Sequence, residues 1–284
     1  MDKLNTKSYP QILFHCLSLT YILFKCFKEK SRSKDSAFKK DLLHLLQINP
    51  TFAEDIFLLS FIHIPKRTPY RQMTLQEIHK IAQQGEGQRL EFKKKAAFPD
   101  KIVREIVALA NTEGGYLLIG VDDDGTVSGQ RFIEEEVFVM EKAIRELIFP
   151  SLDYEVEIFK LNPKKGVAAF KIPHSDNRPH YLKEGEKKKA FVRSKDKSIQ
   201  ASKEVWEIIK RGKSPKDMVF TYGEKETVLM KSLGEKGQIT LKEYQQLAKL
   251  PRFLASKTLV RLVLANVLQI LPSEREDIYM LKES

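Results

Sequence analysis

Residues 85–93 read Gly85-Glu86-Gly87-Gln88-Arg89-Leu90-Glu91-Phe92-Lys93, and residues 111–125 read Asn111-Thr112-Glu113-Gly114-Gly115-Tyr116-Leu117-Leu118-Ile119-Gly120-Val121-Asp122-Asp123-Asp124-Gly125. In the first run, Leu90 and Phe92 alternate with charged residues, which predicts a short strand with the charged pair turned away from the core. The second run is almost continuously apolar over residues 116–121, as in a strand covered on both faces. Three aspartates follow, and Asp124-Gly125 is a hairpin turn signal. The buried strand therefore ends where a fold can present acids to a ligand.

A helix is expected between these two strands. Asp100 follows Pro99 and can cap a helix over residues 101–111, whose apolar side chains repeat at helical spacing. Gly114-Gly115 ends this helix, because a positive φ costs glycine little.

The remaining pattern indicates an α+β fold followed by a small helical unit. Residues 133–147 and 201–210 have helical spacing, whereas 152–158, 167–172 and the segments near 181 and 191 read as strands. From residue 224 three helices are expected, at 224–233, 241–250 and 254–265, followed by a strand pair at 267–270 and 277–281. This is the outline of a winged helix-turn-helix, in which the third helix reads the groove.

Composition is ordinary for a globular protein, with 42% apolar and 31% charged residues in 284. The formal net charge is +11, of which residues 1–72 supply +6 from 12 basic and 6 acidic residues. Cys16 and Cys26 are the two cysteines, which excludes a disulfide framework and a cysteine-rich zinc site. We therefore expect a cytoplasmic protein.

Residues 1–72 differ in kind from the rest. Their apolar run at 11–27 is only about 17 residues long and contains His15 and Lys25, so membrane attachment is disfavoured. Besides this less favoured membrane anchor, two interpretations stay open: a buried helix, or upstream sequence ahead of a working protein that begins at Met73. The predicted divisions are an N-terminal extension at 1–72, an α+β core at 73–211, a linker at 212–223 and the winged helix-turn-helix at 224–284.

The two runs resemble the AlbA-type core domain of the Schlafen family, which is also found in bacterial proteins described as divergent AAA. The resemblance rests on Glu86 with Glu91-Phe92-Lys93 and on the run from Ala110 to Asp123. Arg178-Pro179-His180-Tyr181, Phe191-Val192-Arg193 and Ala201-Ser202 resemble the end of that domain. It covers about residues 74–210, and bacterial relatives often carry a C-terminal winged helix.

This resemblance implies a nucleic-acid-binding domain. In animal Schlafens two such units form an RNA-binding groove, where three carboxylates and a divalent cation cleave tRNA and rRNA. By motif position these carboxylates are Glu86, Glu91 and Asp123, with Lys93 beside them. The chain has one such unit, so a paired groove would require a homodimer, and it lacks the cysteine and histidine ligands of the animal zinc site.

The residues themselves are compatible with that chemistry. Three acids can hold Mg²⁺ or Mn²⁺, which would activate water and stabilise charge on a phosphodiester, while Lys93 could hold the phosphate. Glu86, Glu91 and Asp123 are therefore the candidate metal ligands. The alternative is that Glu91 and Lys93 form an ion pair on one strand face and that residues 122–124 are turn formers.

Candidate nucleic-acid contacts are basic residues in two regions, namely Lys94, Lys187, Lys188, Lys189 and Arg193 in the core, and Arg252, Lys257 and Arg261 near the third C-terminal helix. Tyr181 and Phe191 could stack on bases or pack in the core. ATP is not expected, because the first glycine of a phosphate-binding loop ending in Gly212-Lys213-Ser214 is replaced by Glu207.

The expected function is nucleic-acid binding, in the form of a DNA-binding transcriptional regulator. The alternative is a divalent-metal-dependent endoribonuclease that cleaves tRNA or other structured RNA. The expected partners are DNA or structured RNA and a second copy of the chain, and not a membrane.

Overall fold

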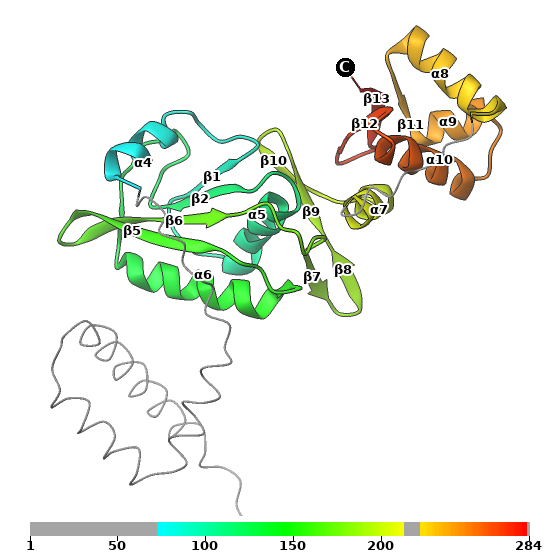
Figure 1. The fold of residues 1–284 in the computed structure, drawn as a ribbon. Helices are drawn as coiled ribbons and strands as arrows, with labels where there is room; N and C mark the ends of the chain where they lie inside the picture. The colour runs from blue at the N-terminus through cyan, green and yellow to red at the C-terminus, as the bar shows by residue number, and fades with distance from the viewer. Residues whose placement is uncertain (1–72, 213–221, 283–284) are drawn as a thin grey trace, which may run out of the picture. The chain divides into compact units, whose positions relative to one another are not determined.

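The structure is a computed structural model that describes residues 73–212 and 222–282 (Figure 1). The predictions for residues 1–72 and for most of the 212–223 linker lie outside these residues. Within the two described ranges, none of the helices combines the length and apolar content that crossing a membrane requires.

The core is built on a five-stranded sheet. β1 (Leu90–Lys93) runs parallel to β2 (Gly115–Ile119), and β2 is antiparallel to β6 (Lys165–Ile172). β6 also pairs with β3 (Gln130–Arg131) and β5 (Glu155–Asn162). α5 (Pro99–Asn111) connects the two parallel strands, so the loops that follow β1 and β2 leave the same edge of the sheet.

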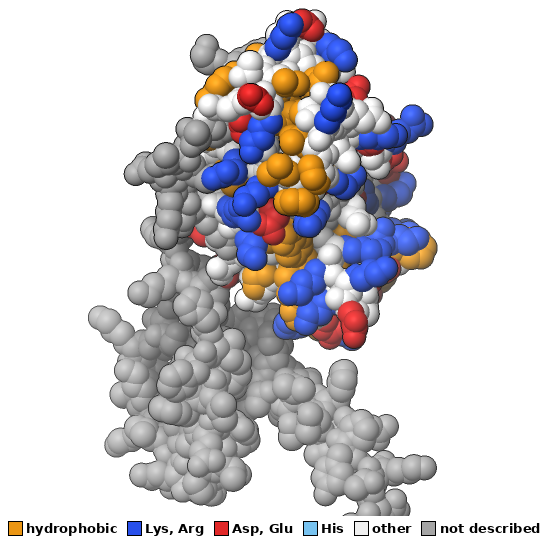
Figure 2. All heavy atoms as spheres, turned by 90° about the vertical axis from the view of Figure 1, so that its right-hand side faces the viewer, with side chains coloured by type: hydrophobic (Ala, Val, Ile, Leu, Met, Phe, Trp, Pro, Cys, Tyr) orange, Lys and Arg blue, Asp and Glu red, His pale blue; other side chains and the backbone are white. Residues whose placement is uncertain are grey.

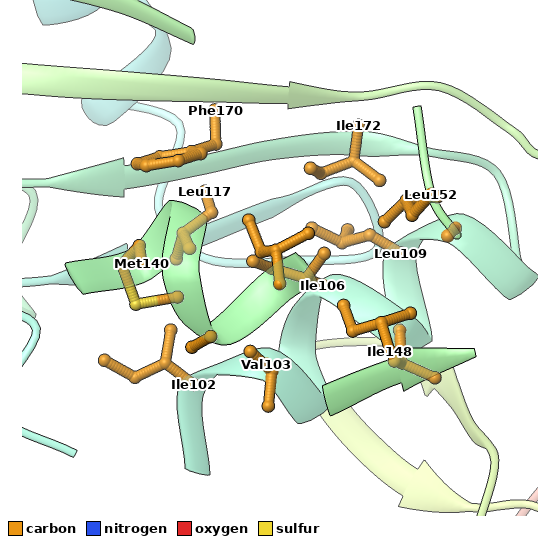
Figure 3. Close-up of a cluster of buried hydrophobic side chains, with 14 of the residues drawn as sticks. Ile102, Val103, Ile106, Leu109, Leu117, Met140, Ile148, Leu152, Phe170 and Ile172 are labelled. Atoms are coloured by element: carbon orange, nitrogen blue, oxygen red, sulfur yellow. The ribbon is translucent and has the colours of Figure 1, made fainter. Parts of the chain in front are cut away.

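Helices cover both faces of this sheet. α5 and α6 (Ile133–Leu147) pack on one face, and α4 (Leu75–Ala82) packs on the other (Figure 1). Side chains of β2 pack on both faces of the sheet. Leu117 belongs to the apolar cluster formed with α5 and α6, and Leu118 belongs to the cluster formed with α4. The first cluster is shown in Figure 3, where Ile102, Val103, Ile106 and Leu109 of α5 meet Met140 of α6 and Phe170 of β6. The strand predicted at residues 116–121 is present as β2, which ends at Ile119, and it is covered on both faces as expected.

The turn between α5 and β2 requires its two glycines. Gly114 has φ +72°, and Gly115 has φ +149°. A Cβ atom at position 115 would lie 2.1 Å from the backbone oxygen of Arg89, so only glycine lets β2 start beside β1.

A second sheet and a hairpin complete the core. β4 (Ile148–Phe149), β7 (Tyr181–Glu184) and β8 (Lys187–Lys189) form a three-stranded antiparallel sheet. β9 (Phe191–Ser194) pairs with β10 (Lys197–Gln200), and α7 (Lys203–Arg211) follows. Val192 of β9 packs with Val205 and Ile209 of α7. This combination of elements confirms the predicted α+β fold.

The C-terminal unit contains three helices and a three-stranded sheet. In chain order these are α8 (Glu224–Lys236), β11 (Gln238–Thr240), α9 (Leu241–Leu247), α10 (Arg252–Leu264), β12 (Leu268–Leu271) and β13 (Ile278–Leu281). The strands lie in the order β11-β13-β12, all antiparallel. The helices enclose an apolar cluster that includes Leu229, Tyr244, Leu259 and Tyr279.

Three details differ from the sequence-based expectations. Phe98 and not Asp100 is the N-cap of α5, because Pro99 already occupies the first helical position and Asp100 lies in the first turn. Strand β11 was not expected, since three residues are too few to show a periodicity. Glu91 was expected on a solvent-facing side of β1, but it is only 5% exposed. Its buried carboxylate is part of the candidate site.

Candidate functional site

The guanidinium of Arg193 lies at the centre of a buried polar cluster. The residue is 2% exposed, and its Nη1 donates to Oε2 of Glu91 at 2.7 Å and to Oε2 of Glu105 at 2.9 Å. Nη2 donates to the backbone oxygen of Gly87 at 2.6 Å. Arg193 on β9 therefore joins β1, α5 and the loop before β1. Its Nε atom is buried without a hydrogen-bond partner.

Glu91 is held by a cation at each of its two oxygens. Oε2 accepts from Arg193, and Oε1 accepts from Nζ of Lys93, which also donates to the backbone oxygen of Phe92 at 2.8 Å. The Glu91–Lys93 ion pair is the structural alternative that the strand pattern left open. The burial of Glu91 is tolerable because the two side chains that bond to its oxygens carry the opposite charge.

Glu105 is the second carboxylate on Arg193. It also accepts a short hydrogen bond from the hydroxyl of Ser198 on β10. Burial raises the pKa of Glu105 above its ordinary value, and the nearby charge of Glu91 raises it further. Sequence reasoning missed this residue, because one glutamate on an amphipathic helix carries no motif signal.

Glu86 lies within electrostatic reach of the same cluster. Its Oε1 accepts from the backbone N–H of Phe92 at 2.9 Å. Burial is the largest cause that raises the pKa of Glu86, and the carboxylates of Glu91 and Asp123 add to it. The structure thus brings the predicted Glu86, Glu91, Lys93 and Asp123 into one region.

The three aspartates after β2 have separate surroundings. Asp122 accepts from Nζ of Lys94 at 2.9 Å, a bond that lowers the pKa of this carboxyl. Asp124 accepts from the backbone N–H of Thr126 at 2.8 Å and so forms the turn. Asp123 is exposed. Lys94, a predicted phosphate contact, is exposed and bonded to Asp122.

In this arrangement, one of the three predicted metal ligands, Glu91, is already bonded to two cationic side chains. Oε1 and Oε2 of Glu91 each accept a hydrogen bond from a cationic side chain, so a metal ion would have to compete with Lys93 or Arg193 for this carboxylate. Among the described residues, no three His, Cys, Asp or Glu side chains are grouped so that they could hold one ion. Carboxylates of the type that Mg²⁺ and Mn²⁺ prefer are present, but Arg193 and Lys93 supply the positive charge beside Glu91.

Two residues of the motif, Asn111 and Thr112, form hydrogen bonds that hold separate segments of the chain together. Asn111, at the end of α5, donates to the backbone oxygens of His180 at 2.8 Å and Phe191 at 3.0 Å, and accepts from the N–H of His180 at 2.7 Å. The hydroxyl of Thr112 accepts from the N–H of Arg193 at 2.9 Å. These bonds fix the end of α5 to β9 and to the segment before β7.

The predicted basic contacts fall into different environments. Arg193 is enclosed by its carboxylate partners, which favours a positioning role for it over contact with phosphate. Lys187 and Lys188 are exposed on β8, and Lys189 is half-buried and paired with Glu184. Arg252, Lys257 and Arg261 are exposed on α10. Phe191 packs in the core cluster, whereas Tyr181 is half-buried.

Comparison with known proteins identifies the core. Residues 86–202 match the family model described as Schlafen, AlbA_2, which confirms the resemblance found in the sequence and indicates a nucleic-acid-related function. The curated proteins contain no match. Among solved structures, the chain is similar to the DIP2311 protein from Corynebacterium diphtheriae, with 19% identity and a TM-score of 0.37. The match covers 59% of this chain and 34% of that protein, about a third of its length.

Replacing Arg193 tests the buried cluster. We expect Arg193→Met to lower the free energy of unfolding by about 3–5 kcal/mol, because Glu91 and Glu105 lose their shared cation. Urea unfolding measures the change, and Arg145→Met, at an exposed position of α6, should alter stability by less than about 0.5 kcal/mol. Adding Glu91→Gln and Glu105→Gln to Arg193→Met should recover part of the loss. A triple variant no more stable than the single one would contradict this explanation.

The raised pKa of Glu86 gives a second prediction. The folded protein binds this proton more tightly than the unfolded chain, so ionising Glu86 costs stability as pH rises from its ordinary value of 4.5 through the raised one. Glu86→Gln should therefore be more stable than the parent at neutral pH, and the difference should vanish below about pH 4.5. Urea midpoints across pH measure it, with the exposed Glu113→Gln as control. A difference that does not change with pH would argue against the prediction.

Proposed function

Because residues 86–202 form a Schlafen AlbA-type domain, we propose that the chain binds nucleic acid and acts as a DNA-binding transcriptional regulator. In this proposal, residues 224–284 are a winged helix-turn-helix that makes the sequence contacts. The AlbA-type core adds electrostatic contacts and pairs with a second copy in a homodimer.

The observation that carries this proposal is the division of α10 into two faces. Ala255, Thr258, Leu259 and Leu262 are buried in the C-terminal unit, whereas Arg252, Lys257 and Arg261 are exposed. Lys257 and Arg261 are four residues apart and so lie on one side of the helix. A helix whose exposed side is basic and whose other side is packed suits insertion into the major groove.

The order of elements supports the same interpretation. α9 and α10 are joined by residues 248–251, and the antiparallel β12 and β13 follow, as expected for a helix-turn-helix with a wing. The β12–β13 connection carries exposed Glu274 and Glu276 beside Arg275. We therefore assign the main phosphate and base contacts to α10 and not to this connection.

Paired charge removals test the proposal. We expect Lys257→Ala/Arg261→Ala to weaken duplex DNA binding at least tenfold and to reduce the slope of log K against log salt by about 2, since each phosphate contact contributes about 1. The matched control is Lys231→Ala/Lys236→Ala, which removes the same charge from exposed positions of α8. Electrophoretic mobility shifts at several salt concentrations measure both. Equal losses in the two double variants would exclude α10 as the contacting helix.

A second candidate function is endoribonuclease activity on tRNA or other structured RNA. One observation favours it: the carboxylates of Glu86, Glu91 and Asp123 lie close enough for the other two to raise the pKa of Glu86. Cleavage sites often contain carboxylates perturbed in this way. The closed arrangement around Glu91 places this candidate second.

For this second function, we expect Mn²⁺-dependent tRNA cleavage that EDTA abolishes and that Asp123→Asn lowers at least a hundredfold. Asp124→Asn is the control, because it alters the neighbouring exposed turn residue, whose hydrogen bond to Thr126 an asparagine can keep. Denaturing gels of the RNA products measure the activity. Intact tRNA with Mn²⁺, or equal activity in the two variants, would exclude these acids as a cleavage site.

A further inference from the structure

One face of the β4-β7-β8 sheet combines aromatic rings with lysines. Leu182 of β7 and Ile148 of β4 point into the core cluster, whereas Tyr181 and Lys183, one residue to either side of Leu182, belong to the opposite face. Phe149 lies directly across from Tyr181, and Lys188 lies directly across from Lys183. Tyr181 and Phe149 are half-buried, and both lysines are exposed.

The aromatic rings of this face form a continuous row. The centroids of Phe149 and Tyr181 are 6.2 Å apart at an interplanar angle of 28°. Trp206 of α7 extends the row, with its ring 5.6 Å from that of Tyr181. All three side chains are half-buried, so each keeps part of its ring surface accessible. On the side of the molecule that Figure 2 shows, hydrophobic side chains lie among many Lys and Arg side chains.

The two lysines of this face lie where their like charges disfavour the pairing of the strands. Lys183 and Lys188 face each other across an antiparallel pair, where like charges destabilise the pairing. Each instead lies over a ring, with Nζ of Lys183 4.2 Å from the centroid of Phe149 and Nζ of Lys188 4.9 Å from that of Tyr181. Neither lysine is paired with a carboxylate in the described residues, whereas the neighbouring Lys189 is paired with Glu184.

We propose that Phe149, Tyr181 and Trp206, with Lys183 and Lys188, bind unpaired bases of a single-stranded nucleic acid. This inference rests on the proposed nucleic-acid binding and names a substrate form and a site for it. A base stacks on a ring, and the lysine over that ring moves to the adjacent phosphate. The phosphate then relieves the repulsion between the two lysines, and stacking replaces the cation–π contact.

Charge complementarity favours nucleic acid over another protein segment as the occupant. Lys183 and Lys188 are exposed and lie over the rings, and Glu184 is ion-paired with Lys189. Glu186, at the tip of the β7–β8 hairpin, is the remaining carboxylate on these strands and their turn. An acidic peptide would match the lysines but would leave the row of rings without flat partners, whereas bases supply them.

Trp206 is the only tryptophan of the chain, so its fluorescence reports directly on this site. We expect a 12-nucleotide oligothymidylate to quench the emission of the full chain, and a duplex of the same length to leave it unchanged. Anisotropy of a labelled oligonucleotide measures binding anywhere on the protein in parallel.

Two variants and one control separate stacking from charge. Tyr181→Leu should weaken oligothymidylate binding roughly 5- to 100-fold, as loss of one stacked base does. Lys183→Gln/Lys188→Gln keeps all the rings, should weaken binding at least fivefold, and remains informative if Tyr181→Leu does not fold. Lys142→Gln/Lys164→Gln removes the same charge from exposed lysines elsewhere in the core and should bind as the parent does.

The remaining outcomes overturn the inference in distinguishable ways. Binding in anisotropy with unchanged Trp206 emission and no effect of the lysine variant would refute this site and leave nucleic-acid binding intact. Equal quenching by polyglutamate would identify a surface for acidic proteins. Absence of binding to any oligonucleotide or duplex would remove both this inference and the proposed function.

Discussion

The buried guanidinium of Arg193 is the constraint on which the core depends. A buried cation is stable only beside opposite charge and hydrogen-bond acceptors. Arg193 has such partners on three separate segments: Glu91 on β1, Glu105 on α5 and the backbone oxygen of Gly87. Each of these partners is costly to lose, because the others would then be left imperfectly compensated. The β9 strand is therefore fixed against the sheet by polar bonds as well as by apolar packing.

Local patterns were sufficient to predict most of the fold. β1, α5 and α6 were predicted because their apolar residues repeat at the period of the element that they form, and β2 because its residues form a continuous apolar run. The environment of Glu91 was not, because its partner Arg193 is 102 positions away in sequence. An alternating strand indicates which residues share a face, but it does not reveal whether a distant arginine covers that face. β3 and β4, of two residues each, leave no detectable period.

The candidate site was predicted in part, for the same reason. The motif identified Glu86, Glu91, Lys93 and Asp123, which do lie in one region, but it contained no information on how their charges are balanced. Arg193 was expected to meet phosphate and instead balances carboxylates. Glu105 and Ser198 complete the cluster from elements whose sequences are ordinary. The acidic residues of a motif thus predict that their side chains lie close together, but they do not predict which carboxylate oxygens are free to bind a ligand.

The Gly114-Gly115 turn before β2 helps to identify the family of this domain but does not indicate its function. Any side chain at position 115 would collide with the backbone of Arg89, so the turn is required by the approach of two strands and by no ligand. The most distinctive part of the motif is therefore required by the fold. A descendant that lost Glu86 and Asp123 would keep this turn, the parallel strand pair and its family resemblance. Within such a lineage, members with these acids and members without them would look alike to any comparison that weighs the glycines most heavily.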